Sequence, residues 1–209
     1  MSRPQKLHLT EDNRLISTRE ALVQAVLELS KVKSFDNISL REVTRTAGIS
    51  PAAFYRHFNN MEQLGIAIVH ESFALLRVGF KKARSGDEPN RLMGIRSLQC
   101  LADFRREHPE RYRYIVSEFN GVPPIREAIH EHWEILEQDL FEDLKSFEGL
   151  EHLKDQSHRM IANLISQVVL GIASDMLLRN ANQQEKEQMY ERGVQQLRLI
   201  ILGAKTWRD

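Results

Sequence analysis

The sequence predicts an all-α protein with a small N-terminal helical domain followed by a larger C-terminal one. Apolar residues recur at helical spacing in most segments between breakers, and no run shows the alternation of a half-buried strand. Helix-start signals recur at Ser39, Ser50 and Asn60. With 209 residues, 42% of them hydrophobic and 28% charged, the chain has the composition of a folded protein. We expect about nine helices in all.

The first predicted helix covers residues 13–33 and places Leu22, Val26 and Leu29 on one stripe. Residues 1–12 lack such a stripe and are expected to form a flexible N-terminal arm. We expect this helix to open a first domain over residues 13–60, followed by a larger domain over residues 61–209.

Two short helices with strong start signals come next. Ser39 and Glu42 have the spacing of a capping box, which predicts a helix that ends near Gly48. Ser50 as N-cap and a proline at the first helical position predict a second helix over residues 51–58. Two short helices joined by a glycine-bearing turn are typical of a helix-turn-helix. Residues 13–60 are therefore predicted to form a helix-turn-helix DNA-binding domain, and residues 61–209 are expected to form an effector-binding and dimerisation domain.

The sequence from Asn60 onward predicts longer helices. Asn60 can cap a helix that runs to residue 84, where the breaker sequence SGDEPN follows. Pro109 is expected to end the next helix, because the residue before a proline is biased away from helical geometry. We predict five further helices, over residues 91–107, 112–119, 125–147, 155–179 and 185–203.

The sequence composition indicates the cellular compartment and excludes some kinds of site. The single cysteine, Cys100, excludes an internal disulfide and a multi-cysteine zinc site. The N-terminus lacks the apolar core of a secretory signal, and the longest apolar stretch is interrupted by Asn163, Gln167 and Asp175. We therefore expect a cytoplasmic protein with no membrane span, no metal and no cofactor.

The second short helix carries the candidate DNA contacts. Phe54 and Phe58 lie four residues apart and are expected to face inward, which leaves the residues between them for other faces. In a helix-turn-helix this helix enters the major groove. Residues 1–60 hold nine Lys and Arg against six Asp and Glu, a mildly basic balance. The residues predicted to meet DNA are Arg41, Ser50, Pro51, Ala52, Ala53, Tyr55, Arg56 and His57. The alternative is a three-helix bundle with solvated polar residues.

The segment SFDNISLREVTRTAGISPAAFYRHFNNMEQL resembles the DNA-binding signature of the TetR family of bacterial transcriptional regulators. The resemblance spans residues 18–64 and implies that Arg41, Tyr55, His57 and the Pro51–Ala53 turn contact DNA. The family usually has a lysine at the start of the fourth helix, where this chain has Met61. One phosphate contact is therefore expected to be missing, with a smaller salt dependence of binding.

A narrower resemblance concerns the regulated genes. The motifs SLREV, FYRHF and RYRYIVSEFNG are similar to those of the FabR and DesT regulators of unsaturated fatty acid synthesis. This likeness implies a repressor of fatty acid or lipid metabolism genes with an acyl-CoA or acyl carrier effector.

One short recognition helix reads little DNA, so we expect a homodimer with half-sites about 34–36 Å apart. The last two helices are the predicted interface, through Leu164, Val168, Ile172, Met176, Val194, Leu197 and Ile201. The alternative is that these residues form the core of a single chain.

Apolar residues of the middle helices could line a cavity for a hydrophobic effector. The candidates are Phe73, Leu76, Phe80, Leu101, Phe104, Trp133 and Met160. Most such residues in proteins belong to the ordinary core.

Two other function classes stay open from the sequence. Glu127 with His130, and Asp155 with His158, have the spacing of paired ligands in a di-metal carboxylate bundle enzyme. A carrier of apolar ligands without DNA binding would need the same cavity. Neither alternative explains the two capped helices before residue 59.

Overall fold

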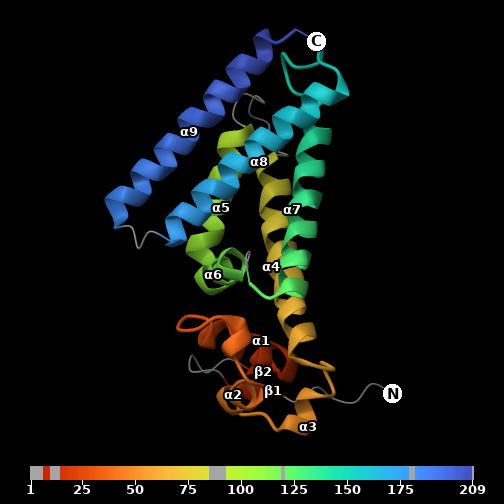
Figure 1. Ribbon diagram of the computed structural model, residues 1–209, viewed down its shortest axis with the longest axis vertical. Coiled ribbons are helices and arrows are strands. Elements are labelled where there is room, and N and C mark those ends of the chain that lie inside the picture. Colours follow the sequence, from red (N-terminus) through yellow and green to blue (C-terminus); the bar gives the residue numbers. More distant parts are fainter. Residues whose placement is uncertain (1–6, 10–14, 85–92, 119–120, 179–181, 209) are drawn as a thin grey trace. The chain divides into compact units, whose positions relative to one another are not determined.

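The computed structural model of the protein describes residues 7–9, 15–84, 93–118, 121–178 and 182–208, and it confirms the all-α class (Figure 1). A 3₁₀ turn, η1, spans Phe35–Asn37. The α-helices of the described residues are α1 (Thr18–Leu29), α2 (Leu40–Thr46), α3 (Pro51–Phe54), α4 (Met61–Arg84), α5 (Met93–Glu107), α6 (Pro109–Ser117), α7 (Pro123–Leu144), α8 (Asp155–Leu178) and α9 (Gln183–Thr206).

A short antiparallel strand pair precedes α1, where the sequence predicts an arm and the start of a helix. Strand β1 (Leu7–Leu9) pairs with β2 (Leu15–Ser17). The helix begins at Thr18 instead of residue 13, because the Ser17 hydroxyl caps it by accepting a hydrogen bond from the Glu20 amide at 3.2 Å. The other residues of the predicted arm, 1–6 and 10–12, lie outside the described residues.

The chain divides into two compact units. We call residues 1–72 and 110–129 the N-terminal unit, and residues 73–109 and 130–209 the C-terminal unit. The N-terminal unit therefore contains α6 and the start of α7 as well as the first helices, so it extends beyond the boundary predicted at residue 60.

Side-chain caps and a glycine turn determine where the short helices of the N-terminal unit begin and end. Ser39 and Glu42 form the predicted capping box of α2. Gly48 follows α2 with a φ of 64°, a left-handed conformation that glycine adopts without steric cost. Ser50 caps α3 by accepting a hydrogen bond from the Ala53 amide at 3.3 Å. These local signals confirm the predicted helix-turn-helix pattern.

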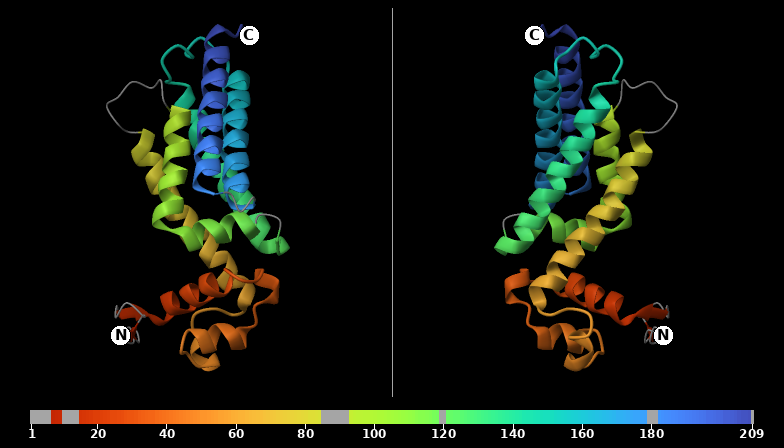
Figure 2. Two further views of the ribbon diagram at one scale, coloured as in Figure 1. Left: turned by 90° about the vertical axis from the view of Figure 1, so that its left-hand side faces the viewer. Right: turned by 90° about the vertical axis from the view of Figure 1, so that its right-hand side faces the viewer.

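The C-terminal unit contains a close pair of helices, α8 and α9, that run side by side (Figure 2). Gly193 of α9 makes the contact close, since a Cβ atom there would lie 3.0 Å from Ile172 Cγ1 and 2.9 Å from Leu98 Cδ2. Both of those side chains are buried. The backbone of α9 therefore approaches α5 and α8 directly.

Several predicted boundaries differ from the structure by a turn or less. Helix α6 begins at Pro109 instead of residue 112, because proline is well tolerated at the first helical position. Helix α7 ends at Leu144, and Phe147, although outside the helix, is buried. Helix α9 begins at Gln183, where Asn182 and Glu185 form a capping box that the sequence analysis missed.

Two helices, α4 and α8, have the length and hydropathy of a membrane span over Met61–Ala83 and Asp155–Leu177. Core helices of soluble proteins commonly have the same properties. Both helices bury side chains within a unit, among them Leu64 and Ile68 of α4 and Ile165 and Val169 of α8. Their apolar character therefore does not indicate a membrane protein.

Candidate nucleic-acid interface

Two aromatic anchors hold the turn of chain that carries α3. Phe54 is 0% exposed and Phe58 is 5% exposed, with ring centroids 5.9 Å apart, which confirms that both face inward. The helix itself ends at Phe54 and does not reach Phe58 as predicted. Residues 55–57 continue as turns, and the His57 and Phe58 amides donate to the Phe54 carbonyl at 2.8 and 3.1 Å.

Most of the predicted DNA contacts lie on the exposed side of these anchors. Tyr55 is 59% exposed, and its ring meets Phe54 edge-on at 5.4 Å. Ala53 is only 7% exposed, so it does not share the exposed surface of the other predicted contacts. The predicted residues that are exposed are Arg41, Ser50, Pro51, Ala52, Tyr55, Arg56 and His57.

Cationic side chains gather on α2 and the α3 turn without acceptors. The side chains of Arg41, Arg45 and Arg56, and the imidazole of His57 beside them, are exposed, and none of these side chains has a hydrogen bond or ion pair to another described residue. Arg45 was not predicted as a contact, although it follows Arg41 by four residues and so shares its helix face. Unpaired cations at close spacing are suited to bind phosphate groups.

Other cations of the N-terminal unit are engaged within the protein. Arg19 pairs with Glu71 and lies over the Phe58 ring, 5.4 Å from its centroid. Lys31 pairs with two acids, at 2.6 Å to Glu28 and 3.3 Å to Glu110. The unpaired cations of α2 and α3 therefore differ from these in having no structural role among the described residues.

The carboxylate of Glu42 explains why Lys33 is not part of the cationic surface. Lys33 Nζ lies 2.5 Å from Glu42 Oε1, while Glu42 Oε2 accepts from the Ser39 amide at 2.9 Å. The hydrogen bonds from Lys33 and Ser39 lower the pKa of Glu42 to about 2. Glu42 therefore stays ionised and holds the first turn of α2 to the segment before it.

The start of α4 is capped as predicted. Asn60 Oδ1 accepts from the Gln63 amide at 2.8 Å, and Gln63 Oε1 accepts from the Asn59 amide at 3.1 Å. Met61, the first residue of the helix, is half-buried. It offers no hydrogen-bond donor on its side chain at the position where the resemblance implies a lysine.

The buried carboxylate of Glu118 is hydrogen-bonded to the segment that precedes α2. Glu118 is 3% exposed, and its Oε1 accepts from the Phe35 amide at 3.2 Å. The Phe35 ring meets Tyr114 of α6 edge-on at 6.1 Å. Gly65 of α4 lies in the same cluster, since a Cβ there would be 2.8 Å from Phe35 Cζ and 3.0 Å from the Tyr114 hydroxyl. The N-terminal unit is thus closely packed from η1 to α6.

Burial in this cluster changes the pKa of Glu118. Burial raises the pKa of the Glu118 carboxyl above its ordinary value of 4.5. The hydrogen bond from Phe35 opposes this rise, and the nearby Asp36 carboxylate adds to it. Glu118 was not predicted as a structural residue, because only the tertiary fold brings it to Phe35.

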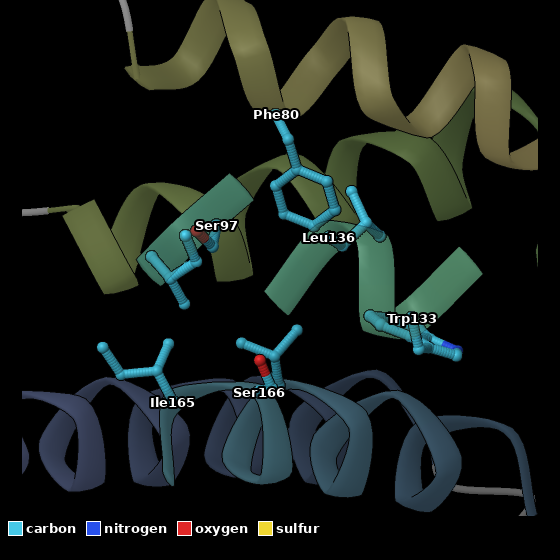
Figure 3. Close-up of a pocket in the computed structure, with 8 residues that line it drawn as sticks. Phe80, Ser97, Trp133, Leu136, Ile165 and Ser166 are labelled. Atoms are coloured by element: carbon cyan, nitrogen blue, oxygen red, sulfur yellow. The ribbon is translucent and has the colours of Figure 1, made fainter. Parts of the chain in front are cut away.

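The C-terminal unit contains a small apolar cavity between α4, α5, α7 and α8. Figure 3 shows Ile165 and Ser166 of α8 pointing toward Phe80 of α4 and Leu136 of α7. The cavity has a volume of about 30 Å³, enough for one or two waters. Its lining residues are Phe80, Ser97, Trp133, Leu136, Leu140, Ile165, Ser166 and Val169.

The predicted effector residues are divided among several places. Phe80 and Trp133 line the small cavity. Leu76 and Phe104 line a separate groove along α4 and α5. Phe73 and Leu101 are buried but line neither space, and Met160 is 44% exposed.

The predicted dimer residues do not form a single exposed face. Ile172, Met176 and Leu197 are buried within the chain, at 3%, 8% and 1% exposed. Leu164 is 45% exposed, and Val168, Val194 and Ile201 are half-buried. Two leucines of α9 that were not predicted are the most exposed, Leu199 at 70% and Leu202 at 63%.

The candidate metal ligands are not brought together. Among the residues that the structure describes, no group of three or more His, Cys, Asp and Glu side chains is placed to hold a metal ion. His158 is 3% exposed, and its Nε2 lies 3.1 Å from the Leu150 carbonyl oxygen. The structure thus gives His158 a local role at the start of α8.

A family model identifies the capped helix pair. Residues 20–68 match the model of the bacterial regulatory proteins of the tetR family. The matched range includes α2, the glycine turn, α3 and the start of α4, which are the elements that expose the cationic surface. The narrower likeness to the FabR and DesT regulators is not part of this match.

Solved structures of transcriptional regulators share the fold at low sequence identity. A regulator from Rhodococcus sp. RHA1 superposes with a TM-score of 0.72 at 17% identity, over 92% of this chain and 100% of its own. A TetR-family regulator from Streptomyces coelicolor superposes with a TM-score of 0.71 at 15% identity, over 90% of this chain and 96% of its own. Escherichia coli NemR in its reduced form superposes with a TM-score of 0.67 at 18% identity, over 87% of this chain and 95% of its own.

The raised pKa of Glu118 predicts a specific pH dependence. The folded state holds this proton more tightly than the unfolded state, whose pKa is near 4.5, so protonation favours folding. Between neutral pH and about 4.5, the free energy of unfolding of the wild type should rise relative to that of Glu118→Gln as the pH falls. Urea unfolding of both proteins at several pH values measures this. A difference that stays constant over the range would contradict the assignment.

Proposed function

We propose that this protein is a dimeric, ligand-responsive repressor that binds operator DNA through α2 and α3, because residues 20–68 match the model of the tetR-family regulatory proteins and transcriptional regulators share the fold. The chain is a DNA-binding regulator and not an enzyme. The observation that carries the proposed contacts is the cluster of exposed, unpaired cations beside the two buried phenylalanines.

In this proposal α3 enters the major groove and α2 lies across the phosphates. Ala52 is exposed and small, so the backbone can approach the base edges, and its methyl group can contact a thymine methyl. Arg41, Arg45 and His57 are placed to bind phosphates. Arg56 is the candidate for a base contact, because arginine can bond both acceptors of a guanine.

The proposed dimer forms through the exposed outer faces of α8 and α9. Leu164, Leu199 and Leu202 are large apolar side chains in water within a single chain. A four-helix arrangement about a two-fold axis would remove them from solvent. The buried Ile172, Met176 and Leu197 would then support the interface from within each chain.

Repression by operator occupancy and release by an effector complete the proposal. An effector acts if it binds one conformation of the dimer better than the other. The narrower resemblance to regulators of unsaturated fatty acid synthesis suggests an acyl-CoA effector and lipid metabolism genes as targets. The apolar cavity in Figure 3 suits a hydrocarbon chain in its chemistry, but at about 30 Å³ it must widen to admit one. We place this activity in the cytoplasm, where operator DNA is accessible.

Removing an unpaired cation should reduce the salt dependence of DNA binding. Each lost phosphate contact lowers the slope of log affinity against log salt by about 0.9. We expect this change for Arg41→Ala and for Arg45→Ala, measured by fluorescence anisotropy on a duplex of arbitrary sequence. Lys31→Ala removes a cation that is already paired with Glu28 and Glu110, so it serves as the matched control. Slopes equal to the wild type in both α2 variants would contradict the proposed phosphate contacts.

Charges on the exposed leucines should disrupt the dimer. We expect Leu199→Asp combined with Leu202→Asp to sediment as a folded monomer, because two buried carboxylates at a dimer interface would lose their hydration. Val32→Asp, at a side chain that is 83% exposed in the N-terminal unit, is the control. A double variant that remains dimeric by analytical ultracentrifugation would rule out this interface.

A long-chain acyl-CoA should change operator affinity if the lipid proposal is right. Allosteric coupling energies typically correspond to about 5- to 150-fold in affinity. We expect a loss of binding within this range in gel shifts on DNA upstream of the protein's own gene, at fixed salt, and no loss with coenzyme A alone. An affinity that acyl-CoA leaves unchanged would refute the acyl-CoA effector without affecting the DNA-binding proposal.

A further inference from the structure

Glu71 of α4 joins two arginines that come from different helices of the N-terminal unit. Its Oε1 is paired with Arg19 of α1, and its Oε2 lies 3.2 Å from Arg111 Nη2 of α6. Residues 1–72 and 110–129 belong to the same unit, so both contacts are internal to it. One carboxylate therefore connects α1 and α6 to α4.

Arg111 is the better buried of the two arginines. Its side chain is 14% exposed, and its Nη1 donates to the Ser72 hydroxyl oxygen at 3.4 Å. Ser72 is buried, and its hydroxyl donates to the Ile68 carbonyl oxygen at 2.6 Å. Burial lowers the pKa of Arg111, and the Glu20 carboxylate opposes this shift. A guanidinium so far removed from water needs an anionic partner, and Glu71 supplies it.

Arg19 extends the contact from Glu71 to the turn that follows α3. Its guanidinium carbon lies 5.4 Å from the centroid of the Phe58 ring, within the range of a cation–π contact. The Arg19 side chain is 44% exposed and has many rotamers, so its place over the ring depends on a partner that restricts it. Glu71 provides this restriction, because its Oε1 accepts from Arg19 Nη1.

Phe58 determines the direction of the turn that follows α3. Its amide donates to the Phe54 carbonyl oxygen at 3.1 Å, and the centroids of the two rings lie 5.9 Å apart. The exposed residues Arg56 and His57 immediately precede it in the chain. A shift of the Phe58 ring would therefore change the direction of both of these side chains.

We propose that Glu71 is a positioning residue for DNA recognition. It holds Arg19 against the Phe58 ring, and so keeps Arg56 and His57 in the orientation that meets DNA. The inference rests on the proposed function, because it requires that α3 binds operator DNA. It adds an acidic residue of α4 to the groups on which DNA binding depends, although an acid repels phosphates.

The direction of the change in affinity separates positioning from charge. Neutralising an acid lessens the repulsion of phosphates, so a residue that acts only through its charge should give tighter binding once neutralised. Glu71→Gln should instead bind the duplex that the wild type selects from a random pool roughly tenfold more weakly, because it removes a charge-assisted hydrogen bond. On a duplex of arbitrary sequence its slope of log affinity against log salt should equal that of the wild type, since no phosphate contact is lost. Fluorescence anisotropy on both duplexes measures this.

Glu110→Gln is the matched control. Glu110 is a carboxylate of the same unit, and it pairs with Lys31 at 3.3 Å instead of with Arg19. Its neutralisation removes the same charge, so it should leave binding to the selected duplex unchanged or tighten it. A loss as large as that of Glu71→Gln would show that the position over Phe58 is irrelevant and would overturn the inference.

A double-mutant cycle tests the route through Arg19. If Glu71 acts by holding Arg19, Glu71→Gln should have little further effect on the selected duplex once Arg19→Gln has been made. Additive losses in the double variant would contradict this route.

Circular dichroism at the temperature of the binding measurement shows whether each variant is folded. If Glu71→Gln unfolds, Arg19→Gln takes its place, because its side chain is more exposed. It should lose more affinity for the selected duplex than for the arbitrary one, and equal losses on the two duplexes would overturn the inference.

Failure of the inference and failure of the proposed function give different results. A folded Glu71→Gln protein that binds the selected duplex as tightly as the wild type, or more tightly, would overturn the inference and leave the proposed function intact. A wild type that selects no sequence would overturn the proposed function, and the inference with it.

Discussion

The burial of Phe54 and Phe58 is the constraint on which the candidate interface depends. A helix of four residues, Pro51–Phe54, has too few internal hydrogen bonds to be stable alone. Its orientation must therefore come from packing, and fully burying a phenylalanine contributes roughly 1.5–3 kcal/mol. With both rings held inside the N-terminal unit, the intervening Tyr55, Arg56 and His57 are necessarily exposed. The turn at Gly48 and the Ser50 cap then determine where that exposed surface begins.

Charge pairing distinguishes the surface available to DNA from the rest of the N-terminal unit. Lys31 and Lys33 carry the same charge as the α2 arginines, but each lies within 2.6 Å of a carboxylate. Arg41 and Arg45 have no such partner among the described residues. A cation that is already paired gains less from a phosphate, because it must first give up its carboxylate. The mild basic excess of residues 1–60 matters less than which cations are left unpaired.

Local signals explain why much of the fold could be predicted from the sequence. Caps at Ser39, Ser50 and Asn60 act within three residues, so the starts of α2, α3 and α4 were correctly predicted. The errors arise where tertiary packing decides. The end of α3, the burial of Ala53 and the role of Glu118 depend on residues far away in the sequence. The predicted dimer face is divided for the same reason, since helical spacing cannot tell a contact within the chain at Leu197 from one between chains.

The most direct test of DNA recognition by α2 and α3 is selection of bound fragments from a random DNA pool, followed by footprinting of the enriched sequence. The account predicts one enriched sequence with two-fold symmetry. It also predicts two protected half-sites in successive major grooves, with centres about 34–36 Å apart or at a multiple of that spacing. Enrichment of no sequence, or protection confined to the minor groove, would contradict it.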